Sequence, residues 1–181
     1  MRRLFVGASL LTLLAGCGGQ SSGLPAEAEA VRKKYADYTV ERAEREGFKR
    51  DKFCLDALSL GYPPDKGAMG YHATDETRLR GPIEADRPQA LLFDTAGKAL
   101  GVEYEIHADA AKEPPRLFGQ TFTKLPPHPG VEHEHYALHV WFVENPVGQF
   151  ADLNPKVSCP PSETPAFQAP PAGGPSHSGG H

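Results

Sequence analysis

The feature that most restricts the fold is an alternation of apolar and charged residues within the segment PQALLFDTAGKALGVEYEIHAD, residues 88–109. The alternating positions are Val102, Tyr104 and Ile106 against Glu103, Glu105 and His107. Successive side chains of a strand point to opposite sides, so this pattern predicts a β-strand. The turn sequence DTAG, residues 94–97, separates it from the apolar run at residues 90–93. We therefore expect an antiparallel hairpin with one buried face.

Two further segments set the expected fold class. Residues 136–143, YALHVWFV, are rich in aromatic and β-branched side chains and predict another strand. Residues 25–46 carry apolar side chains at helical spacing and are followed by Gly47, which is typical of a helix end. We expect an α+β fold, with one N-terminal amphipathic helix packed on an antiparallel, curved sheet or a small, partly open β-barrel.

The start of the chain resembles the export signal of bacterial lipoproteins. A short basic segment and an apolar run close on Leu14-Ala15-Gly16-Cys17, which is similar to the lipobox. In that family the chain is cut before the cysteine, so the resemblance implies a signal peptide at residues 1–16 and acyl chains, palmitate among them, on Cys17. Gly18 stands where an aspartate would imply inner-membrane retention, which points to the outer membrane facing the periplasm. An ordinary secretory peptide with an incidental Cys17 is the alternative.

The charge of the mature chain restricts its partners. Removal of residues 1–16 takes away two of the 19 basic side chains and leaves 17 against 23 acidic ones, a formal charge of −6. Binding to nucleic acid relies on a basic surface, so this charge disfavours a nucleic-acid partner. The sequence holds no other apolar stretch long enough to span a bilayer, so we expect membrane attachment through lipid alone. An envelope protein or a small ligand remains as the expected partner.

The cysteines suggest where the domain begins and ends. With Cys17 lipidated, Cys54 and Cys159 remain, and an even pair in an oxidising compartment predicts a disulfide. A metal-binding pair or two free thiols are the alternatives. We expect residues 17–24 to form a lipidated, flexible tether, residues 25–159 a single globular domain, and residues 160–181 a disordered tail rich in proline and glycine.

The segment VEHEHYALHVWFVENP, residues 131–146, raises the question of a metal site. Its HEHYA sequence lacks the second histidine of the metalloprotease motif His-Glu-x-x-His, and its surroundings predict a strand rather than the helix which that motif needs. Strand geometry places His135 and His139 about 13 Å apart, too far to share one ion. His133 and His135 could share an ion as a His-x-His pair, but their acidic neighbours and the preceding proline-rich loop favour a solvated loop.

His139 is the histidine that the sequence places within the sheet. An imidazole among apolar residues needs a partner, because an unpaired buried polar group costs a few kcal/mol. In one interpretation it is a core histidine satisfied by a carboxylate or a backbone carbonyl. In the other, His72 and Glu103 or Glu105 join it from neighbouring strands to bind a transition metal or a small polar ligand. Two histidines and one carboxylate are a common ligand set for zinc, iron or copper.

Several blocks resemble a group of uncharacterised exported bacterial proteins. These blocks are MGYH, RPQALLFD, GVEYEI, LFGQTF and LHVWFVENPVGQFADLNPKVSC. The resemblance covers about residues 67–159 and implies an exported domain of this extent, without implying a catalytic role. It marks His72, Glu103, His139, Asn145 and Asn154, whereas His133 and His135 fall outside it.

Three functional classes follow from these patterns. The first is a lipid-anchored binding protein of the cell envelope, with a metal ion or small polar ligand held by His72, Glu103 and His139. The second is an envelope hydrolase that uses a histidine and a glutamate as base and partner. The third is a structural lipoprotein that acts through protein contacts. The sequence contains no recognised nucleophile motif, phosphate-binding loop or Cys-x-x-Cys pair, which favours the binding protein over an enzyme.

Overall fold

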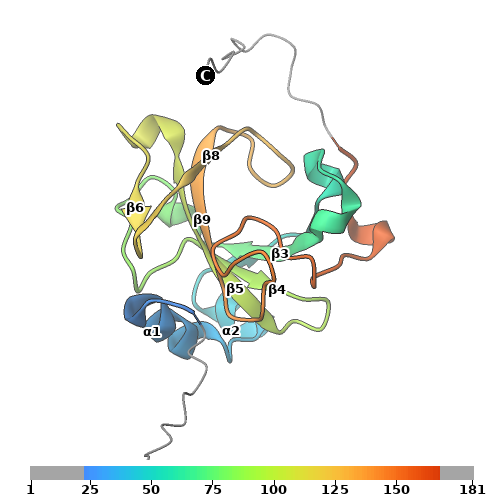
Figure 1. Ribbon diagram of the computed structural model, residues 1–181, viewed down its shortest axis with the longest axis horizontal. Helices are drawn as coiled ribbons and strands as arrows, with labels where there is room; N and C mark the ends of the chain where they lie inside the picture. Colours follow the sequence, from blue (N-terminus) through green and yellow to red (C-terminus); the bar gives the residue numbers. More distant parts are fainter. Residues whose placement is uncertain (1–22, 168–181) are drawn as a thin grey trace, which may run out of the picture.

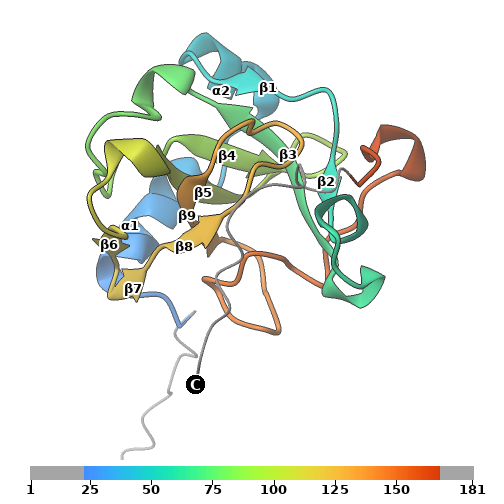
Figure 2. The same ribbon diagram turned by 90° about the horizontal axis from the view of Figure 1, so that it is seen from above.

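The computed structural model describes residues 23–167, and most of their regular structure is antiparallel sheet. The strands of the main sheet are β1 (Lys49–Arg50), β2 (Leu55–Asp56), β3 (Ala68–Thr74), β4 (Ala90–Phe93), β5 (Ala99–His107), β8 (Thr123–Leu125) and β9 (His135–Trp141). Their order is β1-β3-β4-β5-β9-β8, with β2 also paired to β3. A separate hairpin consists of β6 (Arg116–Leu117) and β7 (Gln120–Thr121). Seen from above, β5 and β9 cross the middle of the molecule (Figure 2).

The expected antiparallel sheet is confirmed, and it is not closed into a barrel, since β1 and β8 form opposite ends of the strand order. The expected hairpin is formed by β4 and β5. Its turn is held by Asp94, whose Oδ1 atom accepts hydrogen bonds from the backbone of Ala96 and Lys98. The prediction that only one face of this hairpin is buried is wrong, because Glu103 and Glu105 are just 4% and 2% exposed.

The prediction of a single helix over residues 25–46 is wrong, because two short helices occupy this segment. They are α1 (Ala26–Tyr35) and α2 (Val40–Arg45). Thr39 separates them, because its backbone is extended and its side chain caps α2 by accepting a hydrogen bond from the Arg42 amide. Thr39 also forms an isolated bridge with Lys98. Figure 1 shows both helices below the strands, at the opposite end of the molecule from the loop between β8 and β9.

The two faces of the sheet have different chemistry. One face, here called the apolar face, packs against both helices in the main hydrophobic core. Its strand residues are Tyr71, Ala73, Leu91, Phe93, Val102, Tyr104, Leu138 and Val140. The opposite face, here called the polar face, carries the alternate side chains of the same strands. Its titratable residues are His72, Glu103, Glu105, His107, His135 and His139.

Within residues 23–167, four short 3₁₀ helices lie in the connections between strands and a fifth follows β9. They are η1 (Leu58–Leu60), η2 (Pro64–Lys66), η3 (Glu76–Arg78), η4 (Ala108–Ala110) and η5 (Pro161–Glu163). The last of these follows Cys159, which is joined to Cys54 in the disulfide bond that the sequence predicts. Beyond this bond the chain stays in contact with the domain. The backbone carbonyl of Glu163 accepts a hydrogen bond from the Cys54 amide, and its carboxylate accepts one from the Tyr71 hydroxyl.

The expected signal peptide and the lipidation site at Cys17 lie outside the described residues, as do residues 168–181. Within residues 23–167, neither the length nor the hydropathy of any helix is sufficient for it to traverse a bilayer.

Candidate metal centre

Three side chains that the sequence singles out lie together on the polar face. The Nε2 atom of His72 is 3.1 Å from Oε2 of Glu103, and Nε2 of His139 is 3.7 Å from Oε1 of the same carboxylate. One ligand atom from each residue lies within 4.8 Å of the other two. Two ligands held at about 2.1 Å by one tetrahedral ion are separated by about 3.4 Å, so this spacing suits a single ion.

The register of the sheet explains how residues so distant in sequence meet. Glu103 lies directly opposite His139 in the β5–β9 pair and opposite Ala90 in the β4–β5 pair. His72 belongs to β3, so β4 lies between it and Glu103. Two strand spacings amount to about 10 Å, which only long side chains can bridge. His72 lies opposite Leu92 on β4 and Glu103 lies opposite Ala90, so the two side chains meet along a diagonal across β4.

The side chains of His72, Glu103 and His139 attract one another electrostatically. Burial acts to raise the pKa of Glu103, but the charges of His139 and His72 and the hydrogen bond from His72 outweigh it and hold that pKa well below its usual range. Burial acts to lower the pKa of His72, yet the hydrogen bond and negative charge of Glu103 leave it raised. The site therefore contains an ionised carboxylate within reach of two imidazoles, which is an environment that attracts a cation.

Hydrogen bonding in this site is incomplete. Among the described residues, neither ring nitrogen of His139 has a hydrogen-bond partner, nor does Nδ1 of His72. His139 is completely buried. A buried polar atom without a partner costs about 1–3 kcal/mol, and such atoms in a folded protein call for an explanation such as an ion. A metal ion bound through Nε2 of His139 would supply the missing interaction.

Asp152 lies on the other side of the His139 ring, with its Oδ1 atom 3.7 Å from Nδ1. A carboxylate next to the second nitrogen of a ligating histidine is a frequent arrangement, because it orients the ring and raises its basicity. The loop that brings Asp152 here is held by buried amides. Asn145 donates to the carbonyl of Leu153, and Asn154 donates to the carbonyl of Glu144. These two asparagines, which the resemblance marks, thus shape the loop and contribute no ligand atom to the site.

The sequence predicts that His133 and His135 both lie in a solvated loop. The structure contradicts this prediction for His135. His133 is exposed, in agreement with a solvated loop. His135 is fully buried, because it is the first residue of β9 and not part of the loop. Its register partner across β5 is His107, and the loop between β8 and β9 covers its ring.

His135 contacts a histidine that the sequence did not single out. The Nε2 atoms of His135 and His128 are 3.3 Å apart. His128 lies in the proline-rich segment LPPHPG, where an imidazole is typical of a solvated loop. Burial lowers the pKa of His128 to about 4 and also lowers that of His135. Both rings are therefore neutral at physiological pH.

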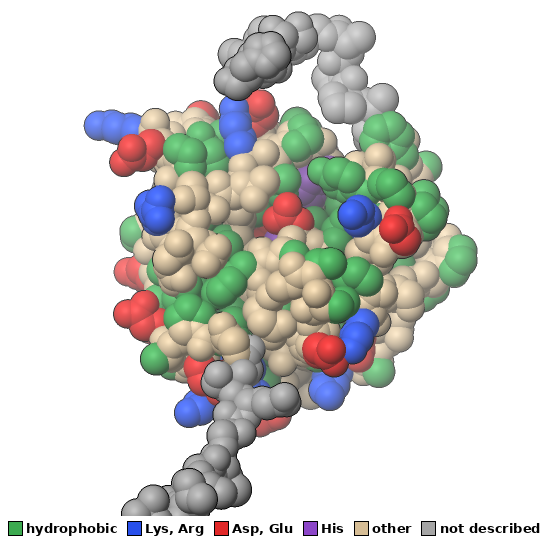
Figure 3. All heavy atoms as spheres, viewed as in Figure 1, with side chains coloured by type: hydrophobic (Ala, Val, Ile, Leu, Met, Phe, Trp, Pro, Cys, Tyr) green, Lys and Arg blue, Asp and Glu red, His purple; other side chains and the backbone are tan. Residues whose placement is uncertain are grey.

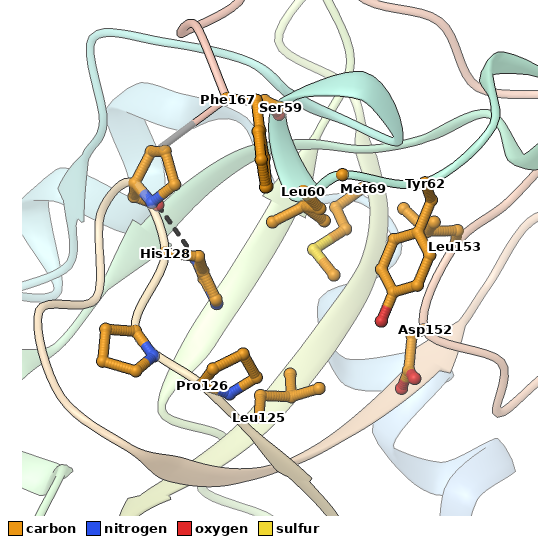
Figure 4. Close-up of a pocket in the computed structure, with 13 residues that line it drawn as sticks. Ser59, Leu60, Tyr62, Met69, Leu125, Pro126, His128, Asp152, Leu153 and Phe167 are labelled. Carbon is orange, nitrogen blue, oxygen red and sulfur yellow. Dashed lines mark hydrogen bonds between the residues drawn. The ribbon is translucent and has the colours of Figure 1, made fainter. Parts of the chain in front are cut away.

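Two cavities approach the polar face from different sides. A cavity of about 790 Å³ is lined by His72, Glu105 and His107 together with the basic segment 49–52. A smaller one of about 230 Å³ is lined by apolar side chains and by His128 and Asp152 (Figure 4). Figure 3 shows histidine atoms recessed in a hollow of the surface, beside an acidic side chain. The polar face is thus reachable from solvent at its margins, whereas His139 at its centre is closed off.

Glu105 lies two residues beyond Glu103 on the same face but outside the three-residue group. Burial and the negative charge of Glu103 raise the pKa of Glu105 to about 8. Its Oε1 atom has no hydrogen-bond partner within residues 23–167. In the metal-free protein this carboxyl group is therefore protonated at neutral pH, in contrast to Glu103.

Glu105 is expected to make the stability of the metal-free protein depend on pH. Between about pH 4.5 and pH 8 the folded state retains a proton that the unfolded state releases, so the free energy of unfolding falls as pH rises through this window. The full effect is on the order of 5 kcal/mol, at about 1.4 kcal/mol per pKa unit. Glu105→Gln removes this dependence, so the variant should unfold at higher denaturant concentration than the wild type above about pH 8. Parallel unfolding midpoints for the two proteins from about pH 5 to pH 9 would contradict this assignment.

Sequence reasoning missed Asp152 and His128 as neighbours of the site. Asp152 lies in FADLNP, a segment whose composition is that of an ordinary turn. Its approach to His139 depends on side-chain hydrogen bonds within the loop, which leave no periodic pattern in the sequence. His128 carried a weak signal, since three prolines surround it and restrict the backbone on both sides.

No family model, no curated protein and no solved structure matches the chain.

Proposed function

We propose that this chain is a metal-binding protein of the bacterial cell envelope, with a divalent transition ion held by His72, Glu103 and His139. The observation that carries the proposal is the buried imidazole of His139, which has no hydrogen-bond partner among the described residues and lies 3.7 Å from an ionised carboxylate. Zinc is the first candidate, because imidazole nitrogen and carboxylate oxygen are both common zinc ligands. Iron and copper accept the same set.

Burial favours metal storage or transfer over catalysis. The exposed fractions of His72, Glu103 and His139 are 6%, 4% and 0%. A hydrolase needs its metal-bound water to meet a substrate in an accessible cleft. His72 lines the larger cavity, whereas Asp152 lies beside the fully buried ring of His139. A binding role is therefore the better explanation of this geometry.

The proposed location rests on the sequence. We place the protein on the outer membrane, facing the periplasm and anchored through acyl chains on Cys17, because residues 14–17 resemble a lipobox. The disulfide between Cys54 and Cys159 is compatible with an oxidising compartment. Such an anchor would keep a metal-binding domain at the membrane surface without a membrane-spanning helix.

Metal binding can be tested by comparing two histidine variants of the full chain in detergent micelles. After chelator treatment and dialysis against zinc, His139→Gln is expected to retain one ion fewer per chain than His133→Gln, as measured by atomic spectrometry. His133 is the matched control, because it lies on the same segment and is exposed. Zinc at about 100 times its Kd should stabilise the wild type by about 2.7 kcal/mol, which corresponds to a rise in Tm of roughly 5–10 °C. Equal metal content in both variants, or no retained zinc, copper or iron in the wild type, would refute the proposal.

A further inference from the structure

The side chains of His128 and His135 make three contacts that two neutral imidazole rings cannot all satisfy with their protons. Nδ1 of His128 is 3.0 Å from the carbonyl oxygen of Pro129, and Nδ1 of His135 is 3.0 Å from that of His133. Their Nε2 atoms face each other at 3.3 Å. A carbonyl oxygen can only accept, so each of these two contacts requires a proton on Nδ1.

Two neutral imidazoles carry two protons between them. When both protons lie on the Nδ1 atoms that donate to the carbonyls, neither Nε2 atom carries a proton. The lone pairs of the two Nε2 atoms then repel each other. A third proton would relieve the repulsion but would place a positive charge on a pair of rings that includes the fully buried His135. A cation between the two nitrogens satisfies all three contacts at once.

We infer that His128 and His135 form a second metal site, which binds zinc through their two Nε2 atoms. At a metal–nitrogen distance of about 2.05 Å, two imidazoles in a tetrahedral complex have nitrogens about 3.3 Å apart. The observed distance between the two Nε2 atoms is 3.3 Å. The site shares no ligand with His72, Glu103 and His139, so it does not rest on the function proposed above.

The backbone carbonyls of Pro129 and His133 act as the outer partners of this site. A ligating histidine usually donates its other N–H to a carbonyl or carboxylate, which fixes the tautomer and the ring orientation. Both rings have this partner before any metal is bound. The chain therefore presents two unprotonated Nε2 atoms at the separation that a zinc ion requires.

The loop holds His128 in place. Three prolines, at positions 126, 127 and 129, restrict the backbone around it. Two reciprocal backbone hydrogen bonds of 2.9 Å close the turn between His128 and Val131. The ligand on the loop is thus positioned against the ligand on β9 at low entropic cost.

One of the two ligands of this site, His128, lines the smaller cavity. His128 and Asp152 lie on opposite sides of this cavity, and Met69 also lines it (Figure 4). Water in the cavity can complete a four-coordinate zinc, and the opening to solvent gives the ion a route in. The ionised carboxylate of Glu103 acts electrostatically on both histidines and adds to the attraction for a cation.

The test is the zinc stoichiometry of the full chain in detergent micelles for four proteins. The wild type and the control His133→Gln should each bind one ion more than His128→Gln and one more than His139→Gln. The double variant His128→Gln/His139→Gln should lose both ions. If His139→Gln loses an ion and His128→Gln does not, the second site is wrong and the first stands. If only His128→Gln loses an ion, the first site is wrong and the second stands.

Two further measurements guard against a variant that misfolds. Circular dichroism in the presence of chelator should show that His128→Gln melts cooperatively and at no lower temperature than the control, and His135→Gln should lose the same ion as His128→Gln. In the wild type, zinc should shift the imidazole nitrogen resonances of Nε2 in both His128 and His135, while both Nδ1 atoms keep their protons. Zinc that binds without shifting these two Nε2 resonances would overturn the second site.

Discussion

The Glu103→Gln variant is expected to lose zinc affinity at the first site by at least about 100-fold, since even the loss of an outer-shell partner costs roughly 10- to 100-fold. Glu103 supplies the carboxylate that both His72 and His139 approach, at 3.1 and 3.7 Å. An amide of the same shape keeps the packing but removes the negative charge that attracts the cation. Calorimetric titration of the chelator-treated chain with zinc measures this change directly.

Glu105→Gln is the matched control for this experiment. Glu105 lies on the same strand and the same face and is equally buried, but it is not one of the three grouped ligands. Its replacement should leave zinc affinity at the first site within a few-fold of the wild type. If the two variants lose affinity equally, the effect comes from the general charge of the polar face and not from coordination by Glu103.

Removal of the disulfide is expected to have the largest effect on stability. The bond between Cys54 and Cys159 closes a loop with a sequence separation of 105 residues. On the chain-entropy account, a loop of about 100 residues contributes about 4–5 kcal/mol. The double variant Cys54→Ala/Cys159→Ala should therefore melt roughly 10–15 °C below the wild type. Differential scanning calorimetry of the metal-free proteins measures the difference.

Reduction of the wild type provides the comparison for the disulfide variant. A reductant should lower the melting temperature of the wild type to near that of the double variant, and it should not affect the variant itself. A wild type whose melting temperature is insensitive to reductant would show that the bond adds no stability. Metal must be absent from both samples, because every proposed ligand lies within the closed loop and zinc would oppose its opening.

The residues that could be predicted from the sequence are those governed by strand periodicity. The alternation around Val102 and Glu103 identified β5, and apolar neighbours placed His139 within the sheet. Once antiparallel strands were expected, long polar side chains on one face could be expected to meet. The grouping of His72, Glu103 and His139 therefore follows from a regular pattern with a fixed geometry.

The features that escaped prediction depend on irregular structure. The break between α1 and α2 comes from Thr39, which favours a cap over a helix interior through its own side chain. The burial of His135 depends on a proline-rich loop that turns back over the sheet and carries His128. Asp152 reaches His139 through a loop held by buried asparagine side chains. None of these contacts has a sequence period, because each depends on where a loop folds in space.

The alternation of the two faces also gives the site a part in selecting the correct strand pairing. A shift of β9 against β5 by one residue would turn every side chain of β9 to the other side of the sheet. His139 would then enter the core beneath the helices and Leu138 would take its place, whereas Glu103 on β5 would stay on the polar face without its histidine partner. A bound ion is compatible with only one of these two pairings. We therefore expect metal availability to affect how quickly the unfolded chain reaches its native strand pairing.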